Sequence, residues 1–269
     1  MTNPKPILDE QSKQNLLWEK FQPHSGIGSS IYCFEQLPST MNVAWEWANH
    51  GGRHGTTILA QHQTAGRGRF KRNWYSNIGE SLTISIIIRT EAVVAKQLSM
   101  IASLGVVTGI QRLTGLQPTI KWPNDVQWDG QKLCGILIES QINTNGKSTV
   151  VLGIGLNLAL DLSNHPEIRD STVSLSDLTH QPISPYNCLV QVLSGLDHHY
   201  QRTTNGINPV NEWQSVCNTI GKSVIAVGPE GSTEGIAQSI DQEGNLILLM
   251  ENGTVTRLSA EEISLKRSL

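Results

Sequence analysis

The sequence is poor in cysteine, and its cysteines lie far apart. The four residues of this type, Cys33, Cys134, Cys188 and Cys217, form no CxxC pair. A disulfide-stapled secreted domain needs a denser set, and a zinc site needs closely spaced ligands. The spacing therefore disfavours zinc and predicts reduced, mostly buried thiols of a cytosolic protein.

Long hydrophobic runs are also missing. The longest dense apolar stretch, "LTISIIIR", is far too short to cross a bilayer. The N-terminus, "MTNPKPILDEQSKQ", is polar and has no apolar segment of the kind that a signal peptide needs. These features predict a cytoplasmic protein that has no membrane as a partner.

The chain has little excess charge of either sign. It contains 20 Lys and Arg against 23 Asp and Glu, which gives a formal net charge of −3. A broad nucleic-acid-binding surface is therefore not expected. One stretch is an exception, because residues 66–72, "GRGRFKR", hold four cations in seven residues. This concentration of charge must serve a local purpose.

The pattern along the chain predicts an α/β domain and a small β domain. Residues 1–29 are rich in Pro, Ser and Gly and look like an N-terminal arm. Residues 30–218 contain the strands "SIYCFEQL", "TTILAQHQ" and "ESLTISIIIR", a long helix ending at Gly115, and a turn at Asp129-Gly130 that joins two strands. Over residues 219–269, short alternating strands with turns about every ten residues predict a small β-barrel.

The basic segment directly follows the strand "TTILAQHQ". Gly66 and Gly68 permit backbone N–H groups to point toward one place, which makes an anion nest. Arg67, Arg69 and Arg72 add hydrogen-bond donors that suit phosphate oxygens. The segment therefore predicts a phosphate-binding loop, and a solvated surface loop with incidental charge is the alternative.

Two nucleotide-binding motifs do not fit. A dinucleotide fingerprint, GxGxxG, needs a glycine at the position of Lys71. A P-loop at "NGKS" needs a glycine at the position of Gln141. The loop must therefore be explained by its own residues.

Three further stretches carry polar groups or glycines in strands. In "KWPNDV", Asp125 could position Mg²⁺ or a substrate amine, or could simply cap a turn. In "KLCGILIES", Lys132 and Gly135 are three positions apart and so fall on opposite faces of an ideal strand, which makes packing as good an explanation for the glycine as function. In "GIGLNL", the two glycines before Asn157 indicate either close approach of a ligand or a β-bulge.

The pair His198-His199 lies in a predicted helix. Neighbouring residues on a helix point about 100° apart, so these two rings do not converge on a metal. We expect both histidines at the surface.

These stretches, in this order, resemble the biotin–protein ligases, or biotin–[acetyl-CoA-carboxylase] ligases, in a short form that lacks an N-terminal DNA-binding domain. The family pattern GRGRRGRxWxS resembles "GRGRFKRNWYS", KWPNDL resembles "KWPNDV", KLAGILxE resembles "KLCGILIE", and GxGxN resembles "GIGLN". The match runs from about residue 31 to the C-terminus. The resemblance implies an α+β fold in which helices flank a mixed β-sheet, followed by a small SH3-like β-barrel.

The resemblance also implies a two-step reaction. Biotin attacks the α-phosphate of Mg²⁺-ATP to give biotinyl-5′-AMP, and a lysine of a biotin carboxyl carrier protein or domain of acetyl-CoA carboxylase then takes the biotin. By position, the implied catalytic residues are Lys132, Arg67, Arg69 and Asp125. The implied biotin contacts are Ser39, Thr40, Gln63, Gly66, Arg67, Lys132, Gly135, Gly153 and Gly155. The implied ATP and adenylate contacts are Arg69, Arg72, Trp74, Asn124, Lys132 and Asn157. Mg²⁺ is expected to arrive with ATP rather than at a fixed protein site.

The loop departs from the family pattern at two positions. Phe70 stands where the family usually has Arg, and Lys71 stands where it usually has Gly. Loss of the glycine predicts a stiffer loop, whereas Lys71 restores the charge that Phe70 removes. These two departures are expected to affect the ordering of the loop more than the reaction that the site carries out.

Three other functions are alternatives to a biotin ligase. A lipoate–protein ligase or octanoyltransferase shares the fold but binds a purely apolar acyl chain, whereas "PST" and Gln63 offer polar contacts for a ureido ring. The others are a non-catalytic regulator that binds biotinyl-AMP and a bare carrier-binding module. About 30 residues precede the core, so we expect no winged-helix domain, no DNA binding and no repressor function. The family includes monomers and dimers, which leaves a homodimer open.

Overall fold

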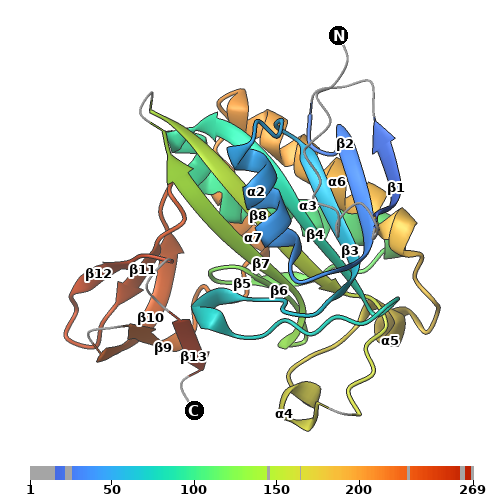
Figure 1. Ribbon diagram of the computed structural model, residues 1–269. Coiled ribbons are helices and arrows are strands. Elements are labelled where there is room, and N and C mark those ends of the chain that lie inside the picture. The colour runs from blue at the N-terminus through green and yellow to red at the C-terminus, as the bar shows by residue number, and fades with distance from the viewer. Residues whose placement is uncertain are drawn as a thin grey trace.

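The predicted fold class is confirmed by the computed structural model, which describes residues 16–21, 26–143, 146–163, 165–228, 231–260 and 264–267. A large mixed β-sheet has helices on both faces, and a smaller antiparallel sheet follows near the C-terminus (Figure 1). The boundaries at residues 29 and 218 stay predictions. Most of the predicted N-terminal arm lies outside the described residues.

Within the part of the chain that the structure describes, the large sheet has eight strands. They are β1 (Leu16–Phe21), β2 (Ser30–Leu37), β3 (Thr56–Gln63), β4 (Ser81–Glu91), β5 (Thr119–Lys121), β6 (Asp125–Trp128), β7 (Gln131–Ile142) and β8 (Lys147–Asn157). Their order is β1-β2-β3-β4-β8-β7-β6-β5, and only β2 and β3 pair in parallel. One strand of the predicted arm thus forms an edge of this sheet.

The described helices and the smaller sheet complete the fold. The helices are α2 (Thr40–Asn49), the 3₁₀ turn η1 (Arg69–Lys71), α3 (Ala92–Thr114), α4 (Pro166–Arg169), α5 (Leu175–Thr179), α6 (Pro185–Thr204) and α7 (Val210–Val216). The smaller sheet contains β9 (Ser223–Gly228), β10 (Gly231–Ile240), β11 (Leu246–Leu249), β12 (Val255–Leu258) and β13 (Ser264–Arg267), in the order β12-β11-β10-β9-β13.

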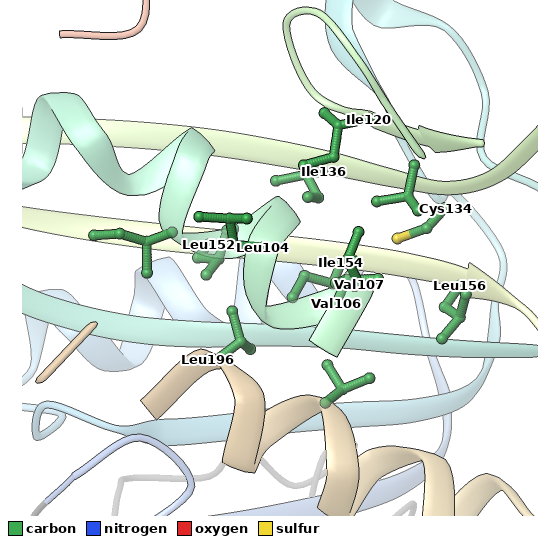
Figure 2. Close-up of a cluster of buried hydrophobic side chains, with 14 of the residues drawn as sticks. Leu104, Val106, Val107, Ile120, Cys134, Ile136, Leu152, Ile154, Leu156 and Leu196 are labelled. Atoms are coloured by element: carbon green, nitrogen blue, oxygen red, sulfur yellow. The ribbon is translucent and has the colours of Figure 1, made fainter. Parts of the chain in front are cut away.

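The large sheet separates two apolar layers. Alternation along β8 turns Leu152, Ile154 and Leu156 toward α3 and α6, where they join the larger core cluster (Figure 2). The opposite face of β4 and β8 contributes Ile87 and Val151 to a smaller cluster beneath α2. Both faces of β4 are therefore buried, as is typical of a strand with so few charged residues.

Helix α3 is a core helix, although its length and composition would allow it to cross a membrane. Of its most apolar window, 72% is buried inside the structure. The helix packs so closely on α6 that a Cβ atom added to Gly105 would lie 2.8 Å from the Leu196 backbone. It ends at Gly115, as predicted, and the φ of 76° at this glycine is the left-handed conformation that commonly terminates a helix.

The segment predicted as two strands around Asp129-Gly130 contains three, because β5 and β6 form a separate short pair before the turn. The turn itself is confirmed, with φ of 47° at Asp129 and 83° at Gly130. Beyond the turn, Gln127 pairs with Lys132 but Val126 pairs with Cys134, so one residue is extra on β7. This is a β-bulge at Leu133.

The bulge corrects one prediction. Lys132 and Gly135 were expected on opposite faces, but a Cβ on Gly135 would lie 3.1 Å from the Lys132 Nζ atom. The extra residue reverses the alternation once, so both residues face the α2 side of the sheet. Function, rather than packing on the far face, therefore becomes the better explanation for Gly135.

The surface prediction holds for His198 and is wrong for His199. His199 is only 3% exposed, and its Nε2 atom lies 2.9 Å from Thr108 Oγ1 on α3. The angle between neighbouring helix positions turns one ring outward and the other into the α3–α6 contact. Burial lowers the pKa of His199 to about 4.

Candidate functional site

A cavity of about 470 Å³ opens on the α2 side of the large sheet. It is lined by the ends of the sheet strands, by the basic loop and by residues of segment 160–172. Every residue that the sequence predicted for the site lines this cavity except Gly66. Gly66 is buried beneath the loop, where its carbonyl accepts a hydrogen bond from the Trp74 N–H at 3.0 Å. The structure thus brings the predicted residues together.

Glycines on two neighbouring strands form the floor of the cavity. Gly135 of β7 pairs with Gly155 of β8, and the next pair on the same face of the sheet is Leu137 with Gly153. A Cβ on Gly155 would lie 2.8 Å from Trp74 Nε1, and a Cβ on Gly153 would lie 2.7 Å from the Met41 sulfur. The register of β8 is unbroken there, so the bulge alternative for its glycines is wrong. Their absence of side chains makes room for the groups above them.

One end of the cavity carries a compact polar network. The Thr40 backbone N–H and hydroxyl both donate to Gln63 Oε1, at 2.8 and 3.1 Å. The Thr40 hydroxyl also lies 2.7 Å from the Ser85 hydroxyl. Ser39, the residue before α2, is buried beside them. The network fixes the Gln63 amide and presents several hydrogen-bonding groups to a ligand.

The other end is built around Lys132. Its Nζ atom lies 2.7 Å from Asp125 Oδ1. Its backbone N–H donates to the Ser171 carbonyl at 2.7 Å, and its carbonyl accepts from the Val173 N–H at 3.0 Å. The Asn157 Nδ2 atom donates to the same Lys132 carbonyl at 3.2 Å. These bonds hold the backbone that carries the ammonium group.

The cations of the basic loop have different partners. Arg69 donates to Asn124 Oδ1 at 3.2 Å and to the Ala260 carbonyl beyond β12. Burial lowers the pKa of Arg69 from its ordinary value. Arg67 forms an ion pair with Glu139 on β7 at 3.1 Å, whereas Arg72 is exposed. Arg67 and Arg69 are therefore held by separate sets of partners.

The loop makes its turn one residue before the family glycine position. Phe70 has a φ of 54°, a left-handed conformation that favours glycine, and the residue is 51% exposed. The Arg69 guanidinium carbon lies 4.8 Å from the centre of this ring. The departure at Phe70 thus replaces a cation with a ring that contacts Arg69.

Trp74 is the aromatic group that covers the floor. Its indole lies over Gly155, and the centre of its ring is 5.7 Å from Lys132 Nζ. Its N–H is buried and has no hydrogen-bond partner among the residues that the structure describes. A ligand acceptor placed there would satisfy this donor.

Sequence reasoning missed two groups of lining residues. Thr83 and Ser85 are hydroxyls within an otherwise apolar strand, and their alternation with isoleucines in "LTISIII" was a usable signal. The second group lies on segment 160–172 and contains Leu160, Leu162, His165 and Ile168. The His165 ring lies 4.0 Å from the Tyr75 ring, centre to centre. No periodic pattern marks that segment, so its place at the cavity could not be predicted from the sequence.

The described residues hold no group of three or more His, Cys, Asp or Glu side chains that could bind a metal ion. Asp125, which the sequence offered as a possible Mg²⁺ contact, is paired with Lys132.

Comparison with known proteins now identifies the family. Residues 33–157 match the Biotin/lipoate A/B protein ligase family, and residues 219–266 match the Biotin protein ligase C terminal domain. The chain is 34% identical over 240 residues to the "Bifunctional ligase/repressor BirA" of Bacillus subtilis (strain 168), covering 87% of this chain and 74% of that protein. The chain belongs to the biotin protein ligase family.

Two further relatives match this chain over nearly the whole of their own length. The "Biotin--[acetyl-CoA-carboxylase] ligase" of Mycobacterium tuberculosis is 31% identical over 275 residues, which cover 97% of each chain. The structure of a biotin protein ligase from Aquifex aeolicus, in complex with biotin and ATP, superposes with a TM-score of 0.77. It is 25% identical and covers 88% of this chain and 99% of its own. The two-part architecture is therefore shared with solved ligases.

Proposed function

We propose that this ligase activates biotin with ATP to give biotinyl-5′-AMP and then transfers biotin to a lysine of a biotin carboxyl carrier protein or domain of acetyl-CoA carboxylase. One observation carries the proposal. A single cavity joins the Thr40–Gln63–Ser85 network, a glycine floor and a cationic end at Lys132. A small polar ring, an apolar chain and a carboxylate would find matching surroundings in that order.

The polar network is assigned to the biotin ureido ring. Thr40 and Gln63 offer both donors and acceptors, as a ring with N–H and C=O groups requires, and buried Ser39 lies next to them. Gly153 leaves room for the body of the molecule, and buried Gly66 shapes the loop above it. Arg67 and Lys132 are assigned to the biotin carboxylate. A lipoate-type acyl chain would leave the polar network without partners.

In the first step, a biotin carboxylate oxygen attacks the α-phosphorus of ATP. The bond from that phosphorus to the bridging oxygen of the β-phosphate breaks, and pyrophosphate leaves. Two anions must meet, so Lys132 and Arg69 serve to offset their repulsion and to stabilise the charge that develops. Exposed Arg72 is assigned to the pyrophosphate side. Mg²⁺ belongs to the proposal as part of the ATP substrate.

The nucleotide is assigned to the region around Trp74. Its indole N–H has no partner among the described residues and can donate to the adenylate. The Asn157 amide N–H groups donate to the carbonyls of Lys132 and Val173, so a contact between Asn157 and the nucleotide would use its oxygen. The Asn124 oxygen holds Arg69. Gly155 and Gly135 keep the floor beneath this group open.

In the second step, the carrier lysine amine attacks the acyl carbon of biotinyl-5′-AMP. The acyl carbon–oxygen bond to phosphate breaks, AMP leaves, and the amine loses a proton. Asp125, 2.7 Å from Lys132 Nζ at the cavity edge, is assigned to positioning the incoming amine. The basic loop and Trp74 would limit water near the mixed anhydride until the carrier arrives.

Labelled biotin provides the direct test. The purified chain should incorporate it into a carrier domain only when ATP and Mg²⁺ are present, and biotin, but not lipoate, should support exchange of labelled pyrophosphate into ATP. Pyrophosphate exchange that depends on lipoate rather than on biotin would favour a lipoate ligase. Biotin binding without exchange would favour a non-catalytic regulator. Both outcomes would contradict the proposal.

A cytoplasmic location and the lack of DNA binding and repressor function also stay proposals. A gel-shift assay at physiological salt addresses the last two, because non-specific binding weakens steeply with salt. Specific binding to an operator fragment under those conditions would contradict them. The choice of carrier and the assembly state are left open.

A further inference from the structure

Glu139 continues the row of residues that forms the cavity floor. After the bulge at Leu133, alternation along β7 places Gly135, Leu137 and Glu139 on one face. Gly135 and Leu137 line the cavity, whereas Glu139 lies one step beyond it, opposite Val151 of β8. A carboxylate thus stands next to a site proposed to bind anions.

This carboxylate connects three elements. Arg67 on the basic loop donates to Glu139 Oε1 from Nε at 3.2 Å and from Nη2 at 3.1 Å. Trp45 on α2 donates from its indole N–H to Glu139 Oε2 at 2.6 Å. Arg67 Nη1 also donates to the Asn42 side chain of α2. The ion pair is partly buried, with the side chains 33% and 34% exposed.

The contacts fix the plane of the Arg67 guanidinium. A guanidinium carries five N–H groups in a rigid fork, and Glu139 and Asn42 together engage all three of its nitrogens. The direction of the remaining N–H groups is therefore fixed as well. Arg67 lines the cavity, so these groups are the ones left to bind an anion there. An isolated arginine would lose much side-chain freedom on binding an anion, and one that is already held loses less.

A negative charge beside Arg67 should weaken its attraction for a second anion. The geometry gives the compensating advantage, because Trp45 holds the carboxylate and the carboxylate holds the arginine. The indole of Trp45 is a rigid donor. It lies on α2, the helix that also borders the polar network through Thr40. One assembly thereby sets both ends of the biotin site.

We propose that Glu139, anchored by Trp45, is a positioning residue that presets the Arg67 guanidinium for the substrate carboxylate. This inference rests on the proposed function, which assigns Arg67 to biotin. Glu139 touches neither substrate in this scheme and acts only through Arg67. Its contribution therefore belongs to biotin binding and not to ATP binding.

The decisive variant is Glu139→Gln, which keeps an acceptor for the Trp45 N–H at nearly the same size but removes the charge. In biotin-dependent pyrophosphate–ATP exchange, we expect the KM for biotin to rise about tenfold, with the KM for ATP and kcat changed less than about twofold. Trp45→Phe removes the anchor and leaves the ion pair, so we expect a smaller rise of about threefold. Glu46→Gln, on the exposed side of α2, is the matched control and should change nothing.

The pattern of the constants separates this role from a purely structural one. A structural ion pair would lower the Tm and would affect both substrates alike. An unchanged biotin KM in Glu139→Gln, or equal rises for biotin and ATP, would overturn the inference. Arg67→Ala tests the underlying assignment in the same assay. If Arg67→Ala weakens biotin binding and Glu139→Gln does not, only the inference fails; if Arg67→Ala has no effect either, the assignment of Arg67 to biotin fails.

Discussion

The substitution Gly155→Ala should disable the site while leaving the fold nearly intact. The new Cβ would lie 2.8 Å from Trp74 Nε1 and closer still to two carbons of the same ring. Ordinary contacts between such atoms are about 3.5–4.0 Å, so the indole must move by about 1 Å. A misplacement of that size can cost about 100-fold in rate, equivalent to about 2.7 kcal/mol in transition-state free energy.

The cost in stability should be small, because Trp74 sits on a loop that can move. Gly105→Ala is the contrasting variant, since its Cβ would meet the α6 backbone at 2.8 Å, where nothing can yield without moving a helix. We expect Gly155→Ala to lower kcat/KM in pyrophosphate–ATP exchange about 100-fold, with a change in unfolding free energy under about 1 kcal/mol. Gly105→Ala should lower the unfolding free energy by about 1–3 kcal/mol and leave the exchange kinetics of the folded enzyme unchanged.

A double-mutant cycle decides whether the clash is with Trp74. In a Trp74→Leu background, Gly155→Ala should have little further effect, because the group it displaces is gone. If Gly155→Ala lowers activity by the same factor with and without Trp74, the reasoning from this contact is refuted. Activity of Gly155→Ala within twofold of the natural chain would refute it too.

Three other predictions follow from the site and the core. Lys132→Ala should reduce biotinyl-5′-AMP formation at least about 100-fold in a single-turnover assay, and unchanged formation would contradict its role. Gln63→Ala should raise the KM for biotin about tenfold but not that for ATP, because it breaks the network with Thr40; equal effects on both substrates would contradict this. His199 has a pKa of about 4 in the fold against about 6.5 in an unfolded chain, so the unfolded state binds the extra proton between these values. Stability should fall by up to about 3 kcal/mol as pH drops from 6.5 to 4, and urea unfolding of His199→Gln should show a flatter pH dependence; an equal slope would contradict the assignment.

The sequence predicted the strands of the large sheet well where their patterning was strong. "LTISIIIR" forms most of β4, a strand that is buried on both faces. The helix that ends at Gly115 was predicted from the helical spacing of its apolar residues and from the glycine that follows them. The predicted site residues converge because the motifs lie at neighbouring strand ends, which is a property of sheet topology. Gly153 and Gly155, which the resemblance assigned to the site, lie on one face because they are two positions apart in a regular strand.

The failures have physical causes of three kinds. The bulge at Leu133 was not visible, because a rule of strict alternation has no place for an extra residue. His199 was misplaced because the sequence does not show which face of α6 meets α3. Segment 160–172 lacks periodicity, so its side of the cavity depends on tertiary contacts such as that between His165 and Tyr75.

The extra residue in β7 makes the placement of the site lysine a matter of chain length. If Leu133 took an ordinary paired position instead of forming a bulge, regular pleating would turn the ammonium group of Lys132 toward the α3 layer of aliphatic side chains, because Lys132 and Gly135 are three positions apart. Deletion of Leu133 would leave Lys132 two positions from Gly135 and on the same face in a regular strand, so a gap of one position in a related sequence would remove the bulge and keep the lysine at the cavity. The spacing between this lysine and this glycine therefore tells whether the strand of a related protein must be bulged for the lysine to reach the site.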